Sequence, residues 1–253
     1  MIALPRTSVI HYERIDSTNA EARRLAGKGE RGPLWLIAGE QTAGRGRLGR
    51  TWVSEPGNLY ATLLLPLECG VAAAAQLGFV AALAVHDVVS AIARTTNVGI
   101  KWPNDVLVGG AKICGLLAEV VSTEPTQVAI GCGLNVGHAP AGTPYPVTAL
   151  ARCADAPPLA VIFQRLDTQL GLRLREWDAG RGFSSIRKNW SARAIGYGGA
   201  VKVASGGREL TGRFVDLAED GALLLATAAG ERIPIHAGDV RFAELEHMRQ
   251  NTP

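Results

Sequence analysis

The stretch KWPNDVLVGGAKICGLLAE, residues 101–119, contains two apolar runs on either side of a tight turn. The runs DVLV and ICGLLAE are separated by GGAK, and paired glycines of this kind favour a short β-hairpin turn. Strands that are adjacent in the chain and joined by a tight turn pair in antiparallel fashion. The stretch therefore predicts an antiparallel hairpin and, with it, a mainly antiparallel sheet.

Apolar periodicity extends this pattern in both directions. Alternating or continuous apolar runs predict further strands at residues 8–15, 34–41, 58–67 and 126–136. Runs of helical character predict helices at residues 16–29, 72–95, 158–179 and 183–193. In the first helix Thr18 is the predicted N-cap, because Glu21 follows three residues later, and Gly27 and Gly29 are predicted to end it.

The pattern of the chain changes after residue 199. Short strands separated by the turns SGGRE, AEDGA and TAAGE predict a small β-barrel of about 55 residues. We therefore expect two domains, residues 1–194 and residues 195–253. The predicted fold class is α+β, with a mixed, mainly antiparallel sheet flanked by helices and a small C-terminal barrel.

The composition is that of an ordinary globular protein. The chain has 253 residues, of which 47% are hydrophobic and 19% charged, so it can bury a core. Its four cysteines contain no C-x-x-C pair, which argues against a zinc site or a disulfide framework and for a reducing cytoplasm. The formal net charge of +3 is too small to indicate nucleic-acid binding, and the apolar stretches are too broken for a membrane span.

A glycine- and arginine-rich stretch, AGRGRLGRTW at residues 43–52, matches the pattern G-x-G-x-x-G. A dinucleotide-binding turn requires a helix directly after this pattern, but Pro56 and Gly57 prevent one here. The stretch is therefore predicted to be a loop, in which Arg45, Arg47 and Arg50 can bind phosphate or carboxylate oxygens. The alternative is a solvated basic loop that binds no ligand.

The hairpin itself carries polar groups. Pro103 restrains the chain so that Asn104 and Asp105 are presented together at the turn that opens the hairpin. Lys112 begins the returning strand, and strict alternation would place its side chain on the face opposite that of Gly115. The alternative is ordinary turn chemistry for the first two polar residues and an edge lysine with its ammonium group in water.

Three glycines, Gly115, Gly131 and Gly133, lie inside predicted strands. Glycine weakens a strand unless something must approach the backbone closely. We interpret these glycines as the floor beneath a ligand that lies across the sheet. A β-bulge or the close packing of a helix is the alternative for any one of them.

Four motifs taken together resemble those of the biotin protein ligases. They are STN at 17–19, EQTAGRGRLGRTW at 40–52, KWPNDVLV and GGAKICGLLAE within 101–119, and IGCGLNV at 130–136. Their order and spacing are similar to the family's, and the combination is far more specific than any single motif. The resemblance implies the catalytic fold of the biotin and lipoate ligases, which is like that of class II aminoacyl-tRNA synthetases, followed by an SH3-like barrel.

The resemblance implies a two-step ligase that uses ATP. The carboxylate of biotin attacks the α-phosphorus of ATP and releases pyrophosphate, and the ε-amine of an acceptor lysine then attacks the resulting biotinoyl-5'-AMP. Mg²⁺ is expected to accompany the nucleotide, held by phosphate oxygens and few protein ligands. Lipoate ligation or octanoyl transfer, which uses the same catalytic fold, is the alternative, although the Gly/Arg loop and the KWPND turn argue against it.

The matching motifs imply roles for individual residues. The implied catalytic residues are Arg45, Arg47 and Lys112, which would stabilise charge on the phosphorus oxygens, and Asp105, which would orient the acceptor amine. Trp52 is expected to stack on adenine or else to belong to the core. The residues implied in binding biotin or the nucleotide are Ser17, Thr18, Asn19, Gln41, Gly44, Gly46, Arg50, Trp52, Asn104, Gly115, Gly133 and Asn135.

The resemblance also implies partners. The implied acceptor is a biotin carboxyl carrier protein domain of acetyl-CoA carboxylase or of another biotin-dependent carboxylase. Only about 16 residues precede STN, too few for the winged-helix domain that some family members carry, so we expect the short form of the ligase, without repressor activity. No nucleic-acid or membrane partner is expected, the expected location is the cytoplasm, and exposed strand edges would allow a homodimer.

Overall fold

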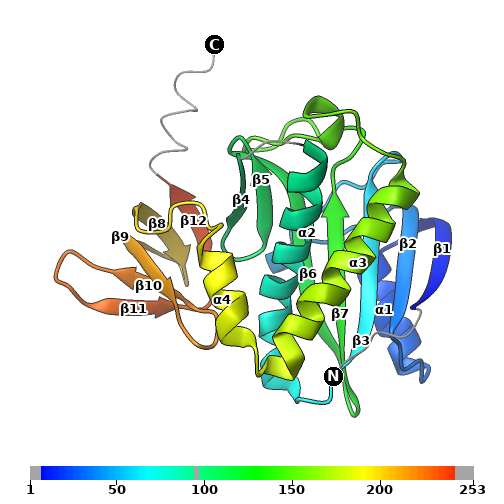
Figure 1. Cartoon of the computed structure of the whole chain (residues 1–253), viewed down its shortest axis with the longest axis horizontal. Helices are drawn as coiled ribbons and strands as arrows, with labels where there is room; N and C mark the ends of the chain where they lie inside the picture. The colour runs from blue at the N-terminus through cyan, green and yellow to red at the C-terminus, as the bar shows by residue number, and fades with distance from the viewer. Residues whose placement is uncertain (1–6, 94–96, 243–253) are drawn as a thin grey trace.

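The computed structural model describes residues 7–93 and 97–242 of the chain. Within these residues the larger of two sheets has seven strands in the order β1-β2-β3-β7-β6-β5-β4 (Figure 1). They are β1 (Ser8–Ile15), β2 (Leu34–Gln41), β3 (Leu59–Pro66), β4 (Val98–Lys101), β5 (Asp105–Val108), β6 (Ala111–Thr123) and β7 (Thr126–Leu134). Strands β1 and β2 are parallel and the other neighbours are antiparallel, which confirms the predicted mixed sheet.

The hairpin of residues 101–119 forms β4, β5 and the first part of β6, at one edge of this sheet. Gly109 and Gly110 have φ values of 58° and 79°, which are the positive values that a tight hairpin turn requires. The pairing shifts beyond the turn, because Leu107 pairs with Lys112 whereas Val106 pairs with Cys114. One extra residue of β6 therefore lies between these pairs, and strict alternation is broken beside Lys112.

Helices cover both faces of the sheet. One face packs against α2 (Leu77–Ala93) and α3 (Leu159–Trp177), with α4 (Phe183–Ser191) beside them, and the other face packs against α1 (Thr18–Gly27) (Figure 1). Strand β3 shows how one sequence serves two cores, because Leu63 and Leu65 join the main core while Leu64 joins the smaller core under α1. The face under α1 is only partly covered, and it is where the site lies.

The first helix corrects one prediction about its N-terminus. Ser17, not Thr18, is the N-cap, since its side-chain oxygen accepts a hydrogen bond from the backbone N–H of Ala20. Thr18 is the first helical residue, and its own N–H is free to bond elsewhere. The helix ends at Gly27, and Gly29 follows with a φ of 91°, as predicted for the end of a helix.

The predicted helix at 72–95 begins as a 3-10 turn, Val71–Gln76, and continues as α2; residues 94–96 lie outside the described part of the chain. By length and composition, Val71–Ala93 is apolar enough to cross a membrane, so the prediction that the apolar stretches are too broken for a membrane span is wrong for this segment. Most of this segment is buried inside the protein, where α2 packs between the sheet and α3. We therefore interpret it as the central core helix of this domain.

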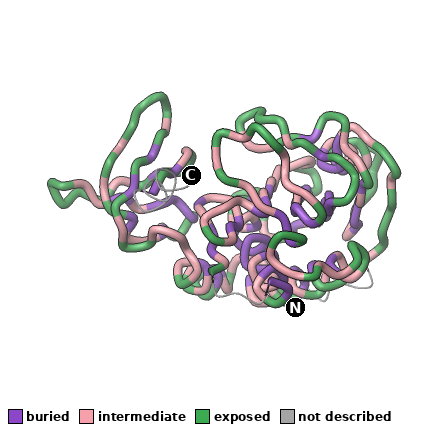
Figure 2. The backbone as a smooth tube through the Cα atoms, turned by 90° about the horizontal axis from the view of Figure 1, so that it is seen from above, coloured by how far each residue is buried: buried purple, intermediate pink, exposed green. Residues whose placement is uncertain are grey.

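A second sheet follows α4. Among residues 200–242 it has five antiparallel strands in the order β11-β10-β9-β8-β12, consistent with the predicted SH3-like barrel. They are β8 (Ala200–Ser205), β9 (Arg208–Leu217), β10 (Leu223–Ala226), β11 (Arg232–Ile235) and β12 (Asp239–Phe242). The buried segments gather in the larger unit and, as a smaller group, in these strands (Figure 2). The domain boundary at residue 194, just before this sheet, stays a prediction.

Candidate functional site

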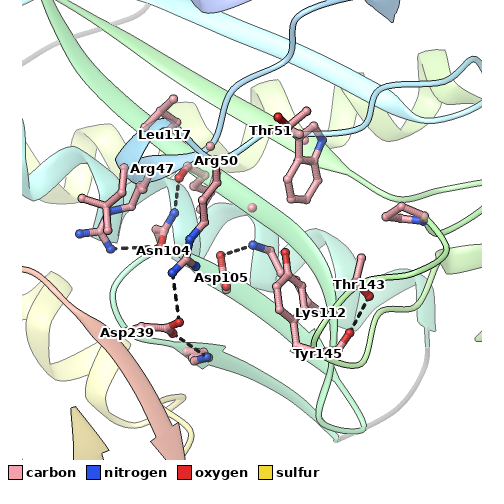
Figure 3. Close-up of a pocket in the computed structure, with 18 of the residues that line it drawn as sticks. Arg47, Arg50, Thr51, Asn104, Asp105, Lys112, Leu117, Thr143, Tyr145 and Asp239 are labelled. Atoms are coloured by element: carbon pink, nitrogen blue, oxygen red, sulfur yellow. Dashed lines mark hydrogen bonds and ion pairs between the residues drawn. The ribbon is translucent and has the colours of Figure 1, made fainter. Parts of the chain in front are cut away.

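A cleft of about 860 Å³ opens on the face of the large sheet that α1 only partly covers. Four segments surround it: the Gly/Arg loop, the turn between β4 and β5 with the start of β6, the loop at 140–146, and β12 of the C-terminal sheet (Figure 3). Sixteen residues were assigned to the site from the sequence, and all of them except Gly44 and Asn135 line this cleft. The structure thus brings together motifs that are far apart in the chain.

One end of the cleft is polar and buried. Ser17, Thr18 and Asn19 are exposed by 3%, 4% and 5% respectively. The backbone N–H of Thr18 donates to Oε1 of Gln41 at 2.9 Å, and the amide of Gln41 donates to the hydroxyl of Ser54 at 2.9 Å. This chain of bonds ties the start of α1 to the end of β2, so the polar groups have fixed positions before any ligand arrives.

Asn19 is held from two strands of the sheet. Its side-chain N–H groups donate to the carbonyl oxygen of Leu117 at 3.2 Å and to Oε2 of Glu119 at 2.8 Å. Its Oδ1 lies directly over Gly131, where a Cβ atom would be 2.3 Å away. Gly131 is therefore required here, because any side chain at that position would displace the carboxamide.

The other two strand glycines make room for Trp52. A Cβ on Gly133 would lie 2.4 Å from the indole nitrogen of Trp52, and a Cβ on Gly115 would lie 2.9 Å from its ring. The predicted close approach to these strands is thus real, but side chains of the protein itself make it. Trp52 lies on the floor of the cleft rather than in the core, and its buried indole N–H has no partner among the described residues. Its stacking on adenine stays a prediction.

Lys112 points into the cleft beside Gly115, on the face opposite to the one that strict alternation predicts. The reason is the irregular pairing at the start of β6, which sequence periodicity could not reveal. Its Nζ lies 2.8 Å from Oδ1 of Asp105, so the two form an ion pair inside the cleft. The same ammonium lies 5.0 Å from the centroid of the Trp52 ring and 5.5 Å from that of Tyr145, within the range of cation–π attraction.

The turn that opens the hairpin is fixed to β6. Asn104 donates from its amide to the carbonyl oxygen of Leu116, while the N–H of Leu116 donates to the carbonyl oxygen of Asn104 at 2.9 Å. The side-chain oxygen of Asn104 accepts from Nη1 of Arg47 at 3.5 Å. Burial lowers the pKa of Arg47, and the nearby charge of Asp105 opposes that effect. Arg47 thus lies at the cleft wall rather than in bulk solvent.

The rest of the Gly/Arg loop is more exposed. Gly46 donates from its N–H to the carbonyl oxygen of Arg50 at 2.7 Å, so the loop folds back on itself. At its tip Leu48 has a φ of 55° and is 76% exposed, which is unusual for a large apolar side chain. Arg45 is also exposed. The loop is confirmed as a loop without a following helix, and the side chain of Leu48 at its tip is in contact with solvent.

The C-terminal sheet contributes a carboxylate that sequence reasoning missed. Oδ2 of Asp239 lies 3.3 Å from Arg50, and its Oδ1 lies 3.5 Å from Nζ of Lys101 at the end of β4. Burial acts to raise the pKa of Asp239, but Lys101 and Arg50 outweigh it and hold the pKa below its usual range. The missed residues, including Tyr145 of the loop at 140–146, carry no motif, and only the folded chain brings them to the cleft.

Two assigned residues lie outside the cleft lining. Asn135 is buried, and its amide donates to the carbonyl oxygen of Thr148 at 3.0 Å, which fixes the end of β7. A Cβ on Gly44 would lie 2.4 Å from the carbonyl oxygen of Trp52, so this glycine lets the loop strands approach each other. In this structure both residues shape the walls of the site, and their predicted contacts with a ligand gain no support from their positions.

The described residues offer no ready-made metal site. No group of three or more His, Cys, Asp or Glu side chains among them could hold a metal ion. Asp105 and Asp239, the two carboxylates of the cleft lining, already pair with lysine and arginine side chains. The donor set therefore does not fit a resident Mg²⁺, and any such ion would have to arrive on phosphate oxygens.

The chain is similar in sequence to known ligases. Residues 12–135 match the family described as Biotin/lipoate A/B protein ligase family, and residues 197–242 match the Biotin protein ligase C terminal domain. It is 40% identical to a biotin–[acetyl-CoA-carboxylase] ligase of Paracoccus denitrificans, an alignment that covers 90% of this chain and 98% of the relative. It is 30% identical to the bifunctional ligase/repressor BirA of Bacillus subtilis, over 92% of this chain and 74% of that relative.

The chain is also similar in structure to solved biotin protein ligases. A biotin protein ligase from Aquifex aeolicus, solved in complex with biotin and ATP, aligns with a TM-score of 0.80 and 26% identity. The alignment covers 93% of this chain and 99% of that one. The similarity therefore extends over both the large sheet and the C-terminal sheet.

Proposed function

The chain belongs to the Biotin/lipoate A/B protein ligase family, and we propose that the cleft is where this ATP-dependent biotin protein ligase joins biotin first to AMP and then to protein. The observation that carries the proposal is the arrangement of the cleft. A buried end with fixed hydrogen-bonding groups lies next to a wall that bears Lys112 and Arg47. One end suits a neutral polar ring, and the other suits the junction of two anions.

In the first step the ring of biotin occupies the polar end, and its valeryl chain leads the carboxylate toward Lys112. The hydroxyl and amide groups of Ser17, Thr18 and Gln41 suit a cyclic urea, which offers two N–H donors and one carbonyl acceptor. The carboxylate then meets the α-phosphorus of ATP, and two anions repel each other. Lys112 and Arg47 offset this repulsion and stabilise the charge that develops on the phosphorus oxygens.

In the second step the ε-amine of an acceptor lysine attacks the mixed anhydride and AMP leaves. Asp105 orients that amine in our proposal, and the ion pair of its Oδ1 with Lys112, at 2.8 Å, supports this role. The acceptor amine would approach the other oxygen. Positioning is enough here, because the anhydride is already strongly activated toward a neutral amine.

The Gly/Arg loop is the lid of the site in this proposal. Its tip carries Leu48, which is 76% exposed, and the exposed Arg45. Closure over the intermediate would bring Arg45 to the phosphate and would bury Leu48, which favours the closed form. A closed loop would also keep water away from the anhydride.

Mg²⁺ enters as the companion of ATP, and no step of the proposal depends on a protein-bound ion. The acceptor that we propose is a biotin carboxyl carrier domain, since the relatives include biotin–[acetyl-CoA-carboxylase] ligases. We also propose that the reaction takes place in the cytoplasm without a nucleic-acid or membrane partner. Among the described residues β1 forms one edge of the seven-stranded sheet, and strand pairing along this edge would give a homodimer.

The lipoate reading is not favoured, because the relatives reported above are biotin ligases. The decisive assay incubates the full chain with ATP, Mg²⁺, a carrier domain and either radiolabelled biotin or radiolabelled lipoate. We expect biotin incorporation and release of pyrophosphate in equal amounts. Incorporation of lipoate alone would overturn the proposal, as would biotin incorporation that does not need ATP.

A further inference from the structure

The ammonium group of Lys112 lies against a carboxylate and two aromatic rings. Its Nζ is 2.8 Å from Oδ1 of Asp105, and the dashed line in Figure 3 marks this ion pair. The same Nζ lies over the ring of Trp52, 5.0 Å from its centroid, and over the ring of Tyr145, 5.5 Å from its centroid. Unlike Asp105 and Trp52, Tyr145 belongs to no sequence motif, so its part in the cleft calls for an account of its own.

The backbone of Lys112 is bound to the segment that carries Tyr145. The N–H of Lys112 donates to the carbonyl oxygen of Pro146 at 2.8 Å, and the carbonyl oxygen of Lys112 accepts from the N–H of Thr148 at 2.9 Å. These two bonds form a parallel bridge between Lys112 and Val147. Tyr145 lies two residues before this bridge. The same short segment therefore holds both the backbone and the side chain of Lys112.

The segment around Tyr145 is itself anchored. The hydroxyl of Thr143 donates to the carbonyl oxygen of Tyr145 at 2.7 Å. Beyond the bridge, the carbonyl oxygen of Thr148 accepts from the amide of Asn135 at 3.0 Å, and the N–H of Leu150 donates to the carbonyl oxygen of Asn135 at 3.1 Å. The segment is thus bound to the start of β6 and to the residue that follows β7. The Tyr145 ring has a defined place beside the cleft.

A ring can hold an ammonium group in a way that a carboxylate cannot. Lysine carries its charge at the end of a flexible four-carbon stem, so one contact leaves the charge free to swing. Asp105 attracts the ammonium but also offsets the positive charge that the reacting anions require. An aromatic ring attracts a cation through its quadrupole and has no net charge, so it does not neutralise the cation.

The contact of Tyr145 with Lys112 is made by the ring of the tyrosine. Tyr145 is half-buried and lines the cleft from the loop at 140–146, whereas Trp52 lies on the cleft floor over Gly115 and Gly133. Because the ring carries the contact, a phenylalanine at this position would hold the ammonium nearly as well. An aliphatic side chain of similar size would not.

We propose that Tyr145 is a positioning residue that holds the Lys112 ammonium at the reacting junction through its aromatic ring. The ring keeps the charge in place before the biotin carboxylate meets the α-phosphorus of ATP. The N–H donors of the ammonium that do not face Asp105 are then available to the ligand oxygens. The inference rests on the proposed function and adds to it the residue that positions its cation.

The first test changes the electron density of the ring and keeps its shape. Tyr145→Phe is compared, in the full chain, with phenylalanines at position 145 that carry one, two or three ring fluorines, because each fluorine weakens the attraction for a cation. Pyrophosphate release is measured at saturating biotin and ATP. We expect kcat of Tyr145→Phe within about 2-fold of wild type, and a stepwise fall to about 5- to 10-fold below wild type with three fluorines. Tyr145→Leu, which has no ring, should lose at least as much.

A double-mutant cycle asks whether Tyr145 acts through Lys112. In the Lys112→Ala background, Tyr145→Leu should lower kcat by less than about 2-fold, because no ammonium is left to hold. Tyr197→Leu is the matched control, since this exposed tyrosine packs its ring on Phe214 and does not line the cleft. It should change kcat by less than about 2-fold in both backgrounds.

Each outcome decides the question. Equal rates along the fluorinated series, or an undiminished effect of Tyr145→Leu in the Lys112→Ala background, would overturn the inference. A higher KM for ATP with an unchanged kcat would also overturn it, because Tyr145 would then act on the nucleotide instead of on Lys112. If Tyr145→Leu does not fold, the fluorinated rings, which are close in size to the natural one, still decide. Wild-type protein that releases no pyrophosphate with biotin and ATP would refute the proposed function instead.

Discussion

The two ends of the cleft are built on different principles. At the polar end Thr18, Asn19 and Thr62 are at most 5% exposed and form a continuous network, so their geometry is fixed in the free protein. At the charged end Arg45 and Arg50 belong to an exposed loop. In the proposed function the polar end is preorganised for one ring, and the exposed loop is the movable part of the charged end.

In the proposed function the two ends of the cleft have different tasks. A neutral ring does not change during the reaction, so a fixed set of donors and acceptors can recognise it at low entropic cost. The charge at the phosphorus grows and disperses during the reaction, and ATP must enter and pyrophosphate leave. Lys112 and Arg47, which are partly buried, would provide the fixed part of that end, and the loop tip would provide the part that moves.

The comparison predicts that substitutions at the charged end act on the rate. Replacing Lys112 with Ala removes the ammonium group at the reacting junction, so we expect kcat for adenylate formation to fall by about 10²- to 10³-fold. The KM for biotin should change by less than about 3-fold, measured by pyrophosphate release. Lys202→Ala, on the exposed face of β8, is the control. A large rise in the KM for biotin with an unchanged kcat would contradict the assignment of Lys112 to the charged end.

Arg47→Ala should have the next largest effect. The loss of its guanidinium removes both a charge and the contact with Asn104, and we expect about a 10²-fold lower rate of adenylate formation. Arg47→Lys should restore little of the lost rate, because a lysine ammonium cannot reproduce the planar guanidinium with its paired N–H donors. Single-turnover assays should also show faster escape of biotinoyl-AMP. Arg208→Ala, at the exposed first residue of β9, serves as the matched control, and equal effects of the two substitutions would contradict the assignment.

Gly131→Ala tests the polar end without touching any charge. The new Cβ would lie 2.3 Å from Oδ1 of Asn19, so the carboxamide must move and its bond with Thr62 must break. We expect the KM for biotin to rise about 10-fold while kcat at saturating biotin stays within about 3-fold. Gly78→Ala in α2, where a Cβ meets nothing within 4 Å, is the control. A fall in kcat alone would show that the two ends are not separable.

Asp239→Asn should have the smallest effect, because its ion pairs with Arg50 and Lys101 are more than a third exposed on the carboxylate side. We expect release of the intermediate to quicken by about 2- to 3-fold at low salt, and high salt should abolish the difference. The same substitution should leave the KM for biotin unchanged. A KM effect would mean that the C-terminal sheet acts on the polar end as well.

The pH dependence of this contact has a definite sign. The pKa of Asp239 is lowered in the folded protein, so its charge stabilises the fold at pH values above the unfolded-chain pKa of about 3.9. That stabilisation is lost as the pH falls through the lower, folded pKa. The rate at which the intermediate is released should therefore not change between about pH 5 and pH 8 on account of Asp239. The rate of release should be measured across this pH window. A change in the rate would mean that a group other than Asp239 controls it.

Much of the fold could be predicted from the sequence because its signals are local. The hairpin turn needs two positive φ values, which Gly109 and Gly110 provide, and the strand at 34–41 was predicted with its observed bounds. Thr18 was misassigned as the N-cap because adjacent Ser and Thr both satisfy the capping pattern. The facing of Lys112 was also predicted wrongly, since a one-residue irregularity in pairing leaves no mark on periodicity.

The site residues divide in the same way, into those with a local sequence signal and those without one. Motif residues could be assigned from the sequence because the chemistry needs particular side chains at short spacing, as in Asn104 and Asp105. Thr62, Tyr145 and Asp239 could not be found in this way. Each is an ordinary residue in its own segment and gains its role only from a neighbour that is distant in the chain.

By itself, the sequence determined the elements, the Gly/Arg loop and the family, because turn geometry, apolar periodicity and motif spacing act within short stretches of chain. The tertiary structure alone decided which groups share hydrogen bonds and charges, from the bonds of Thr18 with Gln41 and of Thr62 with Asn19 to the carboxylate of Asp239 beside Arg50. The physical reason is that hydrogen bonds and ion pairs depend on distances of a few ångströms between residues whose separation in the chain sets no such distance.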